Sequence, residues 1–153
     1  DGEKSQMGQP ALLTAGAAYD VTSALKLSAG FHYFFDKSAD YNGLENEINS
    51  NTTEYLLGAE YALTDKWTVS AGTQFTNYDV TDNYNSNTGF MMSSYSLGGG
   101  LKYNASENLA FNLGVFWTHF DDYAKTADYN GIGVKEQYER KSMVAGIGAV
   151  FSF

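Results

Sequence analysis

The sequence has 153 residues, a net charge of -9 at pH 7 and no cysteine, with 18% charged and 16% aromatic residues. This length suits one domain, and the lack of cysteine excludes a disulfide framework and any thiolate site. Lys and Arg number 9 against 18 Asp and Glu, which argues against nucleic acid as a partner. No window is apolar enough for a transmembrane helix, but membrane β-strands alternate and need no such window.

A repeated unit organises most of the chain. Gly16, Gly58 and Gly100 each begin a Gly-x-x-Tyr segment, so the unit recurs every 42 residues. Each tyrosine is followed by turn residues, at 20–24, 62–66 and 104–108, and then by a second alternating run that begins at 25, 67 or 109. Because a strand, a tight turn and a second strand make a β-hairpin, the repeat predicts three hairpins.

These hairpins and one closing strand give seven predicted strands, at about 11–19, 25–35, 53–61, 67–78, 92–103, 109–120 and 140–153. Three longer polar stretches, 37–52, 79–90 and 121–139, are predicted to be loops. Short turns therefore meet at one rim and long loops at the other. That asymmetry predicts an all-β fold, an antiparallel transmembrane β-barrel, with long loops extracellular and the turns and C-terminus periplasmic.

Every predicted strand alternates between an apolar and a polar side. The apolar side carries no charged residue, so we expect it to face lipid. The polar side holds nine of the 16 glycines with Ser, Thr, Lys and His, and we expect it to line a lumen. Two aromatic girdles are predicted at the membrane boundaries, namely Tyr19, Tyr61 and Tyr103 near the short turns and Phe35, Phe75 and Trp117 near the long loops.

Two soluble folds share part of this pattern. A β-sandwich also alternates, but its strands average about 5–6 residues, and its solvent face carries more Lys and Glu than the polar side does here. A propeller repeats at about 40–45 residues, but each of its blades needs four short strands. The barrel fits better than either.

Patterns that carry chemistry are nearly absent. No arrangement of catalytic residues occurs, so the chain is not expected to be an enzyme, and no cofactor is expected. His32 and His119 lie on opposite sides of different strands, which predicts no metal site. The acidic loop residues are predicted to be solvated. The alternative is that one of two acidic groups binds a divalent ion, and these groups are Asp40, Glu45 and Glu47 or Asp121 and Asp122.

Candidate ligand-binding residues are those expected to face the lumen. A carboxylate would find cationic partners there, and apolar side chains would contact a hydrophobic ligand. The candidates are Arg140, Lys102, Lys26 and His32 for the carboxylate, and Phe34 and Phe116 for apolar contact.

Three segments carry a family resemblance. Residues 92–103, with the run Ser-Leu-Gly-Gly-Gly-Leu-Lys-Tyr, and residues 108–118 resemble the closing strands of FadL-type outer-membrane transport proteins, in the form of their Bacteroidetes branch. Residues 140–153 are similar to the ending of that family, with Phe153 as the terminal aromatic residue that barrel-assembly machinery reads. The resemblance covers the chain from about residue 10 to its end.

This resemblance implies a 14-stranded monomeric barrel, of which residues 1–153 are the C-terminal half of one domain. It implies uptake of long-chain fatty acids or other hydrophobic compounds, and a secretion-system shuttle or surface-binding scaffold is the alternative within the same family. The expected partners are membrane lipid, hydrophobic small molecules, the barrel-assembly machinery through Phe153, and the N-terminal half of the barrel. The first residues, 1–6, have the polar composition of a loop within a longer protein, which predicts that the N-terminal half precedes this chain.

Overall fold

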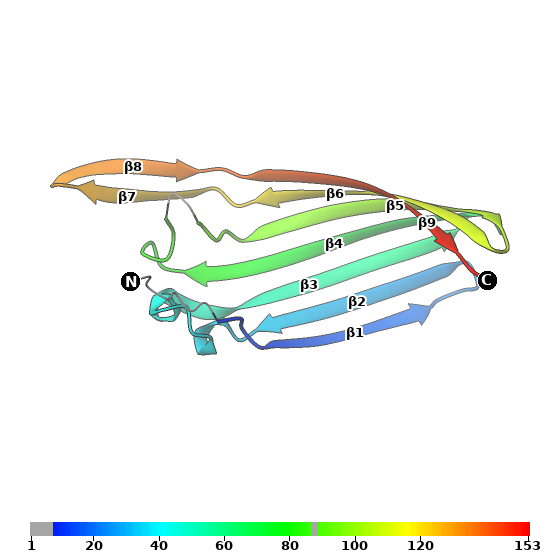
Figure 1. Ribbon diagram of the computed structural model, residues 1–153, viewed down its shortest axis with the longest axis horizontal. Helices are drawn as coiled ribbons and strands as arrows, with labels where there is room; N and C mark the ends of the chain where they lie inside the picture. The colour runs from blue at the N-terminus through cyan, green and yellow to red at the C-terminus, as the bar shows by residue number, and fades with distance from the viewer. Residues whose placement is uncertain (1–7, 87–88) are drawn as a thin grey trace, which may run out of the picture.

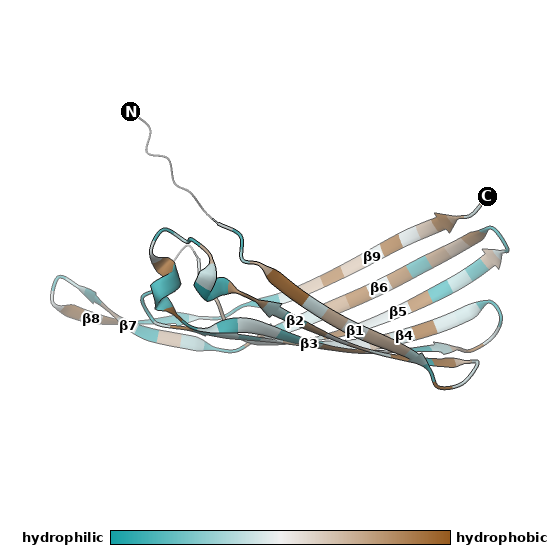
Figure 2. Cartoon of the chain, turned by 90° about the horizontal axis from the view of Figure 1, so that it is seen from below, coloured by the Kyte–Doolittle hydropathy of each residue, from teal (hydrophilic) through white to brown (hydrophobic). Residues whose placement is uncertain are grey.

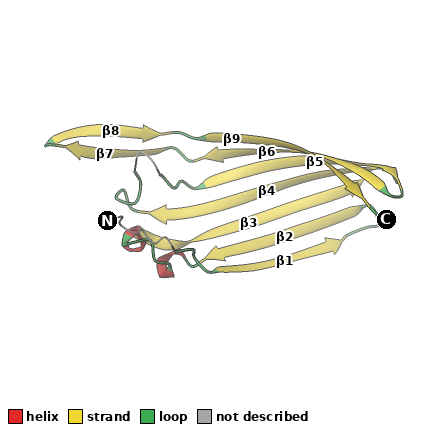
Figure 3. Cartoon of the chain, in the orientation of Figure 1, coloured by secondary structure: helices red, strands yellow, loops and turns green. Residues whose placement is uncertain are grey.

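The computed structural model describes residues 8–86 and 89–153 and consists mainly of β-strands (Figures 1 and 3). Two short 3-10 segments, η1 (Asp36–Ser38) and η2 (Leu44–Glu47), follow the second strand. Within these described ranges, no helix has the length and hydrophobicity needed to cross a membrane. The strands are β1 (Leu12–Asp20), β2 (Leu25–Phe34), β3 (Ile48–Ala62), β4 (Trp67–Val80), β5 (Ser94–Ser106), β6 (Leu109–Phe120), β7 (Tyr123–Tyr129), β8 (Ile132–Tyr138) and β9 (Lys141–Phe151).

One antiparallel sheet contains seven of these strands, in the order β1-β2-β3-β4-β5-β6-β9, and β7 and β8 form a separate pair. The seven strands run side by side with a common tilt, and the sheet is twisted and curved (Figures 1 and 2). β1 and β9 are the edges of this open sheet. The described residues therefore form a section of a barrel wall and not a closed barrel.

The predicted hairpins are confirmed, and the first two close in the same way. The Thr22 hydroxyl accepts the backbone N–H of Leu25 at 3.0 Å, and Thr64 repeats this contact with Trp67 at 3.1 Å. Each repeat pairs two glycines across its strands, and these pairs are Gly16 with Gly30, Gly58 with Gly72, and Gly100 with Gly114. The repeat in the sequence is therefore a repeat in strand register.

Three sequence-based boundaries are wrong in part. β5 continues to Ser106, inside the predicted turn 104–108, and β3 begins at Ile48, inside the predicted loop 37–52. The predicted loop 121–139 contains the hairpin β7–β8, which extends beyond the seven-stranded sheet (Figure 1). Its turn is Asn130-Gly131, with φ of 58° and 84°. Asn-Gly at two positive φ angles is a strong short-range hairpin signal, but the polar composition of the segment favoured a loop.

The two faces of the seven-stranded sheet differ in exposure in its central strands. The odd-numbered side chains form what we term the outer face, where Leu57 is 56% exposed and Leu97 is 52% exposed. The even-numbered side chains form the inner face, where Ser96 and Thr118 are only 4% and 8% exposed. Hydrophobic and hydrophilic residues alternate along the strands (Figure 2). Because soluble proteins bury the apolar side instead, the outer face suits lipid.

Among the described residues, the buried apolar side chains lie at the long-loop rim. Ala39 and Met92 lie in the connecting segments, and Ile48 opens β3. In the outer face, aromatic rings pack near both strand ends, with Trp67 and Tyr103 4.4 Å apart between ring centroids. The sheet itself thus has no hydrophobic core of the soluble kind, and apolar packing gathers where the loops fold over it.

Candidate functional site

A row of polar side chains crosses the inner face from β2 to β6. We call it the polar belt, and it consists of His32, Glu54, Gln74, Thr76, Ser96 and Thr118. Strand register brings these side chains together, because His32 lies opposite Glu54, Gln74 opposite Ser96, and Ser96 opposite Thr118. The belt forms two adjacent hydrogen-bonded groups, of which the second is the buried Ser96–Thr118 hydroxyl pair at 2.9 Å.

Glu54 is the centre of the first group. One carboxylate oxygen lies 2.8 Å from His32 Nδ1. The other accepts hydrogen bonds from the Gln74 amide at 3.0 Å and the Thr76 hydroxyl at 3.1 Å. The Glu54 side chain is 16% exposed, so this carboxylate is held by protein donors while still reaching the inner surface. Sequence analysis missed Glu54, although its even position within predicted strand 53–61 was a sufficient signal.

Next to the belt, on the side of the short turns, the inner face is hollowed. A hollow of about 400 Å³ is lined by Leu56, Gln74 and Phe116, and by backbone at several glycines. A Cβ at Gly98 would lie 3.1 Å from the Phe116 ring, so glycine at this position leaves room for that ring. A second hollow of about 680 Å³ continues toward the short turns, where it is lined by more glycines and by Lys102. The inner wall thus offers space beside its polar belt.

The structure separates the candidate site residues into distinct places. His32 is in the polar belt, with Phe34 beside it at 6.3 Å between rings, and Phe116 lines the adjacent hollow. Lys26 lies near the short-turn rim, 3.6 Å from the Asp20 carboxylate. Lys102 lies opposite Thr68 and Asn112 in the neighbouring strands, also toward that rim. The candidates therefore do not form one binding pocket.

Arg140 lies at the long-loop rim, just before β9. Its guanidinium carbon is 4.7 Å from the centroid of the Phe120 ring, which is a cation–π contact. Within residues 8–86 and 89–153, no carboxylate forms an ion pair with it. Arg140 is exposed, so its guanidinium is available to an anion arriving from the loop side.

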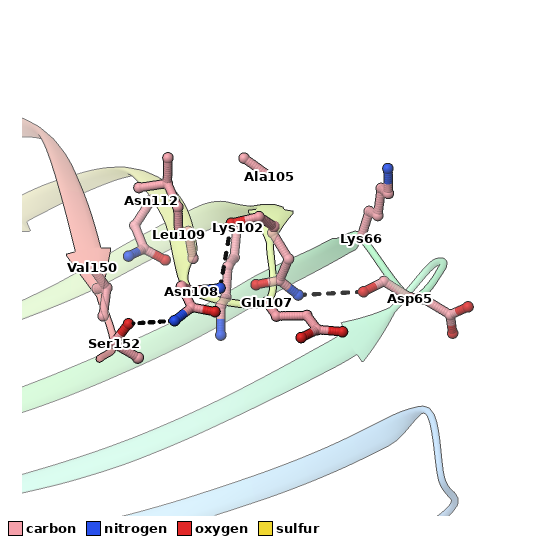
Figure 4. A pocket seen from close by; sticks show the side chains of 13 residues that line it. Asp65, Lys66, Lys102, Ala105, Glu107, Asn108, Leu109, Asn112, Val150 and Ser152 are labelled. Carbon is pink, nitrogen blue, oxygen red and sulfur yellow. Dashed lines mark hydrogen bonds between the residues drawn. The ribbon is translucent and has the colours of Figure 1, made fainter.

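At the short-turn rim, a pocket of about 650 Å³ lies between the turns of two hairpins and the end of β9 (Figure 4). The Asn104 amide donates to the Asp65 carbonyl at 3.3 Å, and the Asn108 amide donates to the Ser152 carbonyl at 2.8 Å. These contacts join neighbouring turns to one another, so we interpret this pocket as part of the structure of the rim.

The long-loop rim is folded rather than open. The Asp36 carboxylate accepts the backbone N–H of Thr52 at 2.9 Å and the Tyr41 hydroxyl at 3.3 Å. Burial, with the nearby Asp36 charge, raises the pKa of Tyr41 to about 12. Tyr123 donates to Asp82 at 2.6 Å, and burial together with this bond raises its pKa to about 12 as well. These contacts tie the connecting segments to the strands.

The acidic loop residues do not gather into a metal site. Across the described ranges, no group of three or more His, Asp or Glu side chains has the geometry to hold a metal ion. Glu45 accepts the backbone N–H groups of Tyr41 and Gly43, at 3.1 and 2.9 Å. Glu47 accepts the hydroxyl of Thr81. These carboxylates therefore hold the loops in place.

Comparison with known proteins gives one family match and several similar structures. The sequence matches the family described as "Putative MetA-pathway of phenol degradation" over residues 8–135. A structure described as "CymD monoaromatic hydrocarbon channel" is similar, with TM-score 0.64 and 16% identity over 95% of this chain. A Pseudomonas aeruginosa FadL homologue is similar with TM-score 0.68 and 17% identity over 93%. No curated protein sequence matches the chain.

These matches cover 36% and 35% of the two solved chains, so this chain spans about a third of their length. The likeness shows that the chain has the fold of FadL-type outer-membrane barrels, which confirms the predicted fold class and resemblance.

Proposed function

We propose, from the premise that this chain belongs to the family described as "Putative MetA-pathway of phenol degradation", that it forms part of an outer-membrane channel for small hydrophobic compounds. The observation that carries this proposal is the contrast between the two faces of the sheet. One face is apolar and exposed, and the opposite face carries a polar belt with adjacent hollows. The similar fold of a structure described as a monoaromatic hydrocarbon channel supports it.

The proposal requires the sheet to be completed. The open edges of β1 and β9 would leave backbone N–H and C=O groups without partners in lipid, which costs several kcal/mol for each group. We propose that these seven strands are the last half of a 14-stranded barrel. The long loops would then be extracellular, and the short turns and Phe153 would lie in the periplasm, within reach of barrel-assembly machinery.

Transport by the full-length protein in lipid vesicles tests the channel directly. We expect toluene to enter vesicles that contain the protein faster than protein-free vesicles, while glucose enters both equally. Leu56→Trp, on the inner face beside the hollow, should slow toluene entry severalfold because the larger ring fills that space. Leu97→Trp is the control, since Leu97 lies on the outer face, where it is 52% exposed, and does not line this hollow. Equal toluene entry with and without the protein would contradict the proposal.

A second candidate is the capture of long-chain fatty acids, and one observation favours it. Arg140 is exposed at the long-loop rim, stacks on Phe120 and has no ion-pair partner among the described residues. A guanidinium binds carboxylates in a bidentate geometry. Under this hypothesis, Arg140→Ala in the full-length protein weakens binding of a long-chain acid but not of the matched alkane. Equal losses for both ligands would indicate a structural role, and no loss would remove Arg140 from the site.

A further inference from the structure

Glu54 retains capacity to bind a ligand. An ionised carboxylate accepts roughly four hydrogen bonds, and Glu54 accepts three, from His32, Gln74 and Thr76. Its side chain is not sealed, because 16% of its surface remains exposed. The carboxylate is thus fixed in position by its neighbours and can still accept one hydrogen bond from a group in the lumen.

The hollow beside Glu54 suits an apolar ring. Leu56 is the next inner-face residue after Glu54 along β3, and it lines the hollow together with Phe116. Gln74 joins the two features, since it lines the hollow and donates to Glu54. A volume of about 400 Å³ is within the range of small-molecule sites. A ring in this hollow would therefore lie next to a fixed carboxylate.

The charges of the inner wall disfavour a carboxylate ligand at this point. Lys26 and Lys102 each lie six residues from the belt residue of their own strand, His32 or Ser96, which is about 20 Å along a strand. Arg140 precedes β9, four strands across the sheet from β3. His32 lies beside Glu54, but its Nδ1 is already engaged by the Glu54 carboxylate at 2.8 Å. An anionic ligand would therefore meet Glu54 with no Lys or Arg of the described strands β2 to β4 next to it.

We propose that Glu54 and the adjacent hollow form a binding subsite for a neutral aromatic compound that bears a hydroxyl group. The ring contacts Leu56 and Phe116, and the hydroxyl donates a hydrogen bond to Glu54. Glu54 is the residue that determines specificity, because it accepts a hydrogen bond from a hydroxyl, whereas an ionised carboxylate has no proton to donate to it. This inference rests on the proposed channel function and names its substrate class.

Binding to the wild-type full-length protein tests the inference without any substitution. Phenol, anisole and benzoate are compared by calorimetric titration in detergent. Anisole has a methyl group in place of the hydroxyl proton, so it cannot donate to Glu54. Because hydrogen bonds to charged groups are strong, phenol should bind roughly 10- to 100-fold more tightly than anisole. Benzoate should bind more weakly than either. Anisole binding as tightly as phenol would overturn the inference.

Glu54→Gln assigns the effect to this residue. The amide keeps the size of the side chain and removes its charge, so phenol should lose its advantage over anisole and benzoate should bind more tightly. Glu107→Gln removes the same charge at the short-turn rim, far from the hollow, and should leave all three affinities unchanged. An unchanged ratio of phenol to anisole in a correctly folded Glu54→Gln barrel would overturn the inference. The wild-type comparison decides it if this variant does not fold.

The two proposals fail in different ways. If toluene and anisole cross vesicle membranes through the protein but phenol has no binding advantage, the subsite is wrong and the channel stands. If no neutral aromatic compound crosses, the channel itself is wrong. Tight benzoate binding that depends on Arg140 and not on Glu54 would contradict the subsite and favour the fatty-acid hypothesis.

Discussion

The inner and outer faces of the seven-stranded sheet share one backbone but differ in the exposure and bonding of their side chains. Ser96 and Leu97 are neighbours in β5, yet the serine is 4% exposed and the leucine 52% exposed. Even a polar group on the outer face is satisfied internally, since the Thr73 hydroxyl donates to the Ser96 carbonyl at 2.8 Å. The difference fits two faces in different surroundings. A side that faces lipid must present no unpaired polar group, whereas polar side chains on the other side can form hydrogen bonds with one another.

The faces also differ in what holds them together. The inner face relies on specific hydrogen bonds at fixed register positions, as in the polar belt. In the proposed barrel, the outer face would rely on contact between apolar side chains and lipid, which is not directional. We therefore expect the outer face to tolerate exchange of one apolar residue for another and the inner face to respond to the loss of a single hydroxyl. The following predictions test this contrast.

The largest expected effect comes from charge on the wrong face. Leu113 is on the outer face and is 52% exposed, whereas its neighbour Asn112 is on the inner face. Leu113→Arg should cost about 2–4 kcal/mol of folding free energy in a bilayer, and Asn112→Arg much less. The folding yield of each variant into lipid vesicles, at increasing urea concentrations, measures both costs. Similar costs, or the reverse order, would mean that the two faces are assigned wrongly.

A smaller effect is expected from the buried Ser96–Thr118 pair. Thr118→Val removes one hydroxyl and leaves Ser96 without its partner, which should cost about 1–3 kcal/mol. Adding Ser96→Ala to that variant should recover part of the loss, because the buried polar group is then gone as well. Urea unfolding of the two single variants and the double variant measures the coupling. Strictly additive losses would show that the hydroxyls do not depend on each other.

Two adjacent glycines provide a finer test of the contrast. A Cβ at Gly100, on the inner face, would lie 2.5 Å from the Ser70 hydroxyl, while one at Gly99, on the outer face, would lie 3.7 Å from its nearest neighbour. Gly100→Ala should destabilise the barrel by about 1 kcal/mol, and Gly99→Ala should be close to neutral. The measurement is again the urea midpoint. A greater loss for Gly99→Ala would show that crowding is not confined to the inner face.

The smallest effect is expected at the long-loop rim. The pKa of Tyr41 is raised from 10.0 to about 12 by burial and by Asp36, so the folded loop holds the tyrosine proton more tightly than the unfolded loop does. The stabilisation is complete below pH 10 and is lost as the pH rises from 10 to 12. Protease cleavage within residues 36–47 should therefore increase over this interval. Tyr41→Phe should weaken that dependence, and an identical pH profile for both proteins would refute the assignment.

Much of the fold follows from local pattern. Alternation with a period of two sets the two faces, and the spacing of Gly16, Gly58 and Gly100 sets three hairpins whose glycine pairs repeat in register. The β7–β8 hairpin was also readable from Asn130-Gly131, but its polar composition concealed it. The candidate site was less predictable, because Lys26 lies beside Asp20 and the other candidates are spread along the wall.

What the sequence determined by itself was the hairpins, the two faces and the β-barrel fold class, since these depend on residues close together in the chain. Only the tertiary structure decided that Glu54 meets His32, Gln74 and Thr76, and that Ser96 meets Thr118. These partners lie about twenty residues apart in the sequence, and they meet because strand register fixes which even-numbered residues stand opposite one another. Alternation assigns a residue to a face, and register gives it its partner.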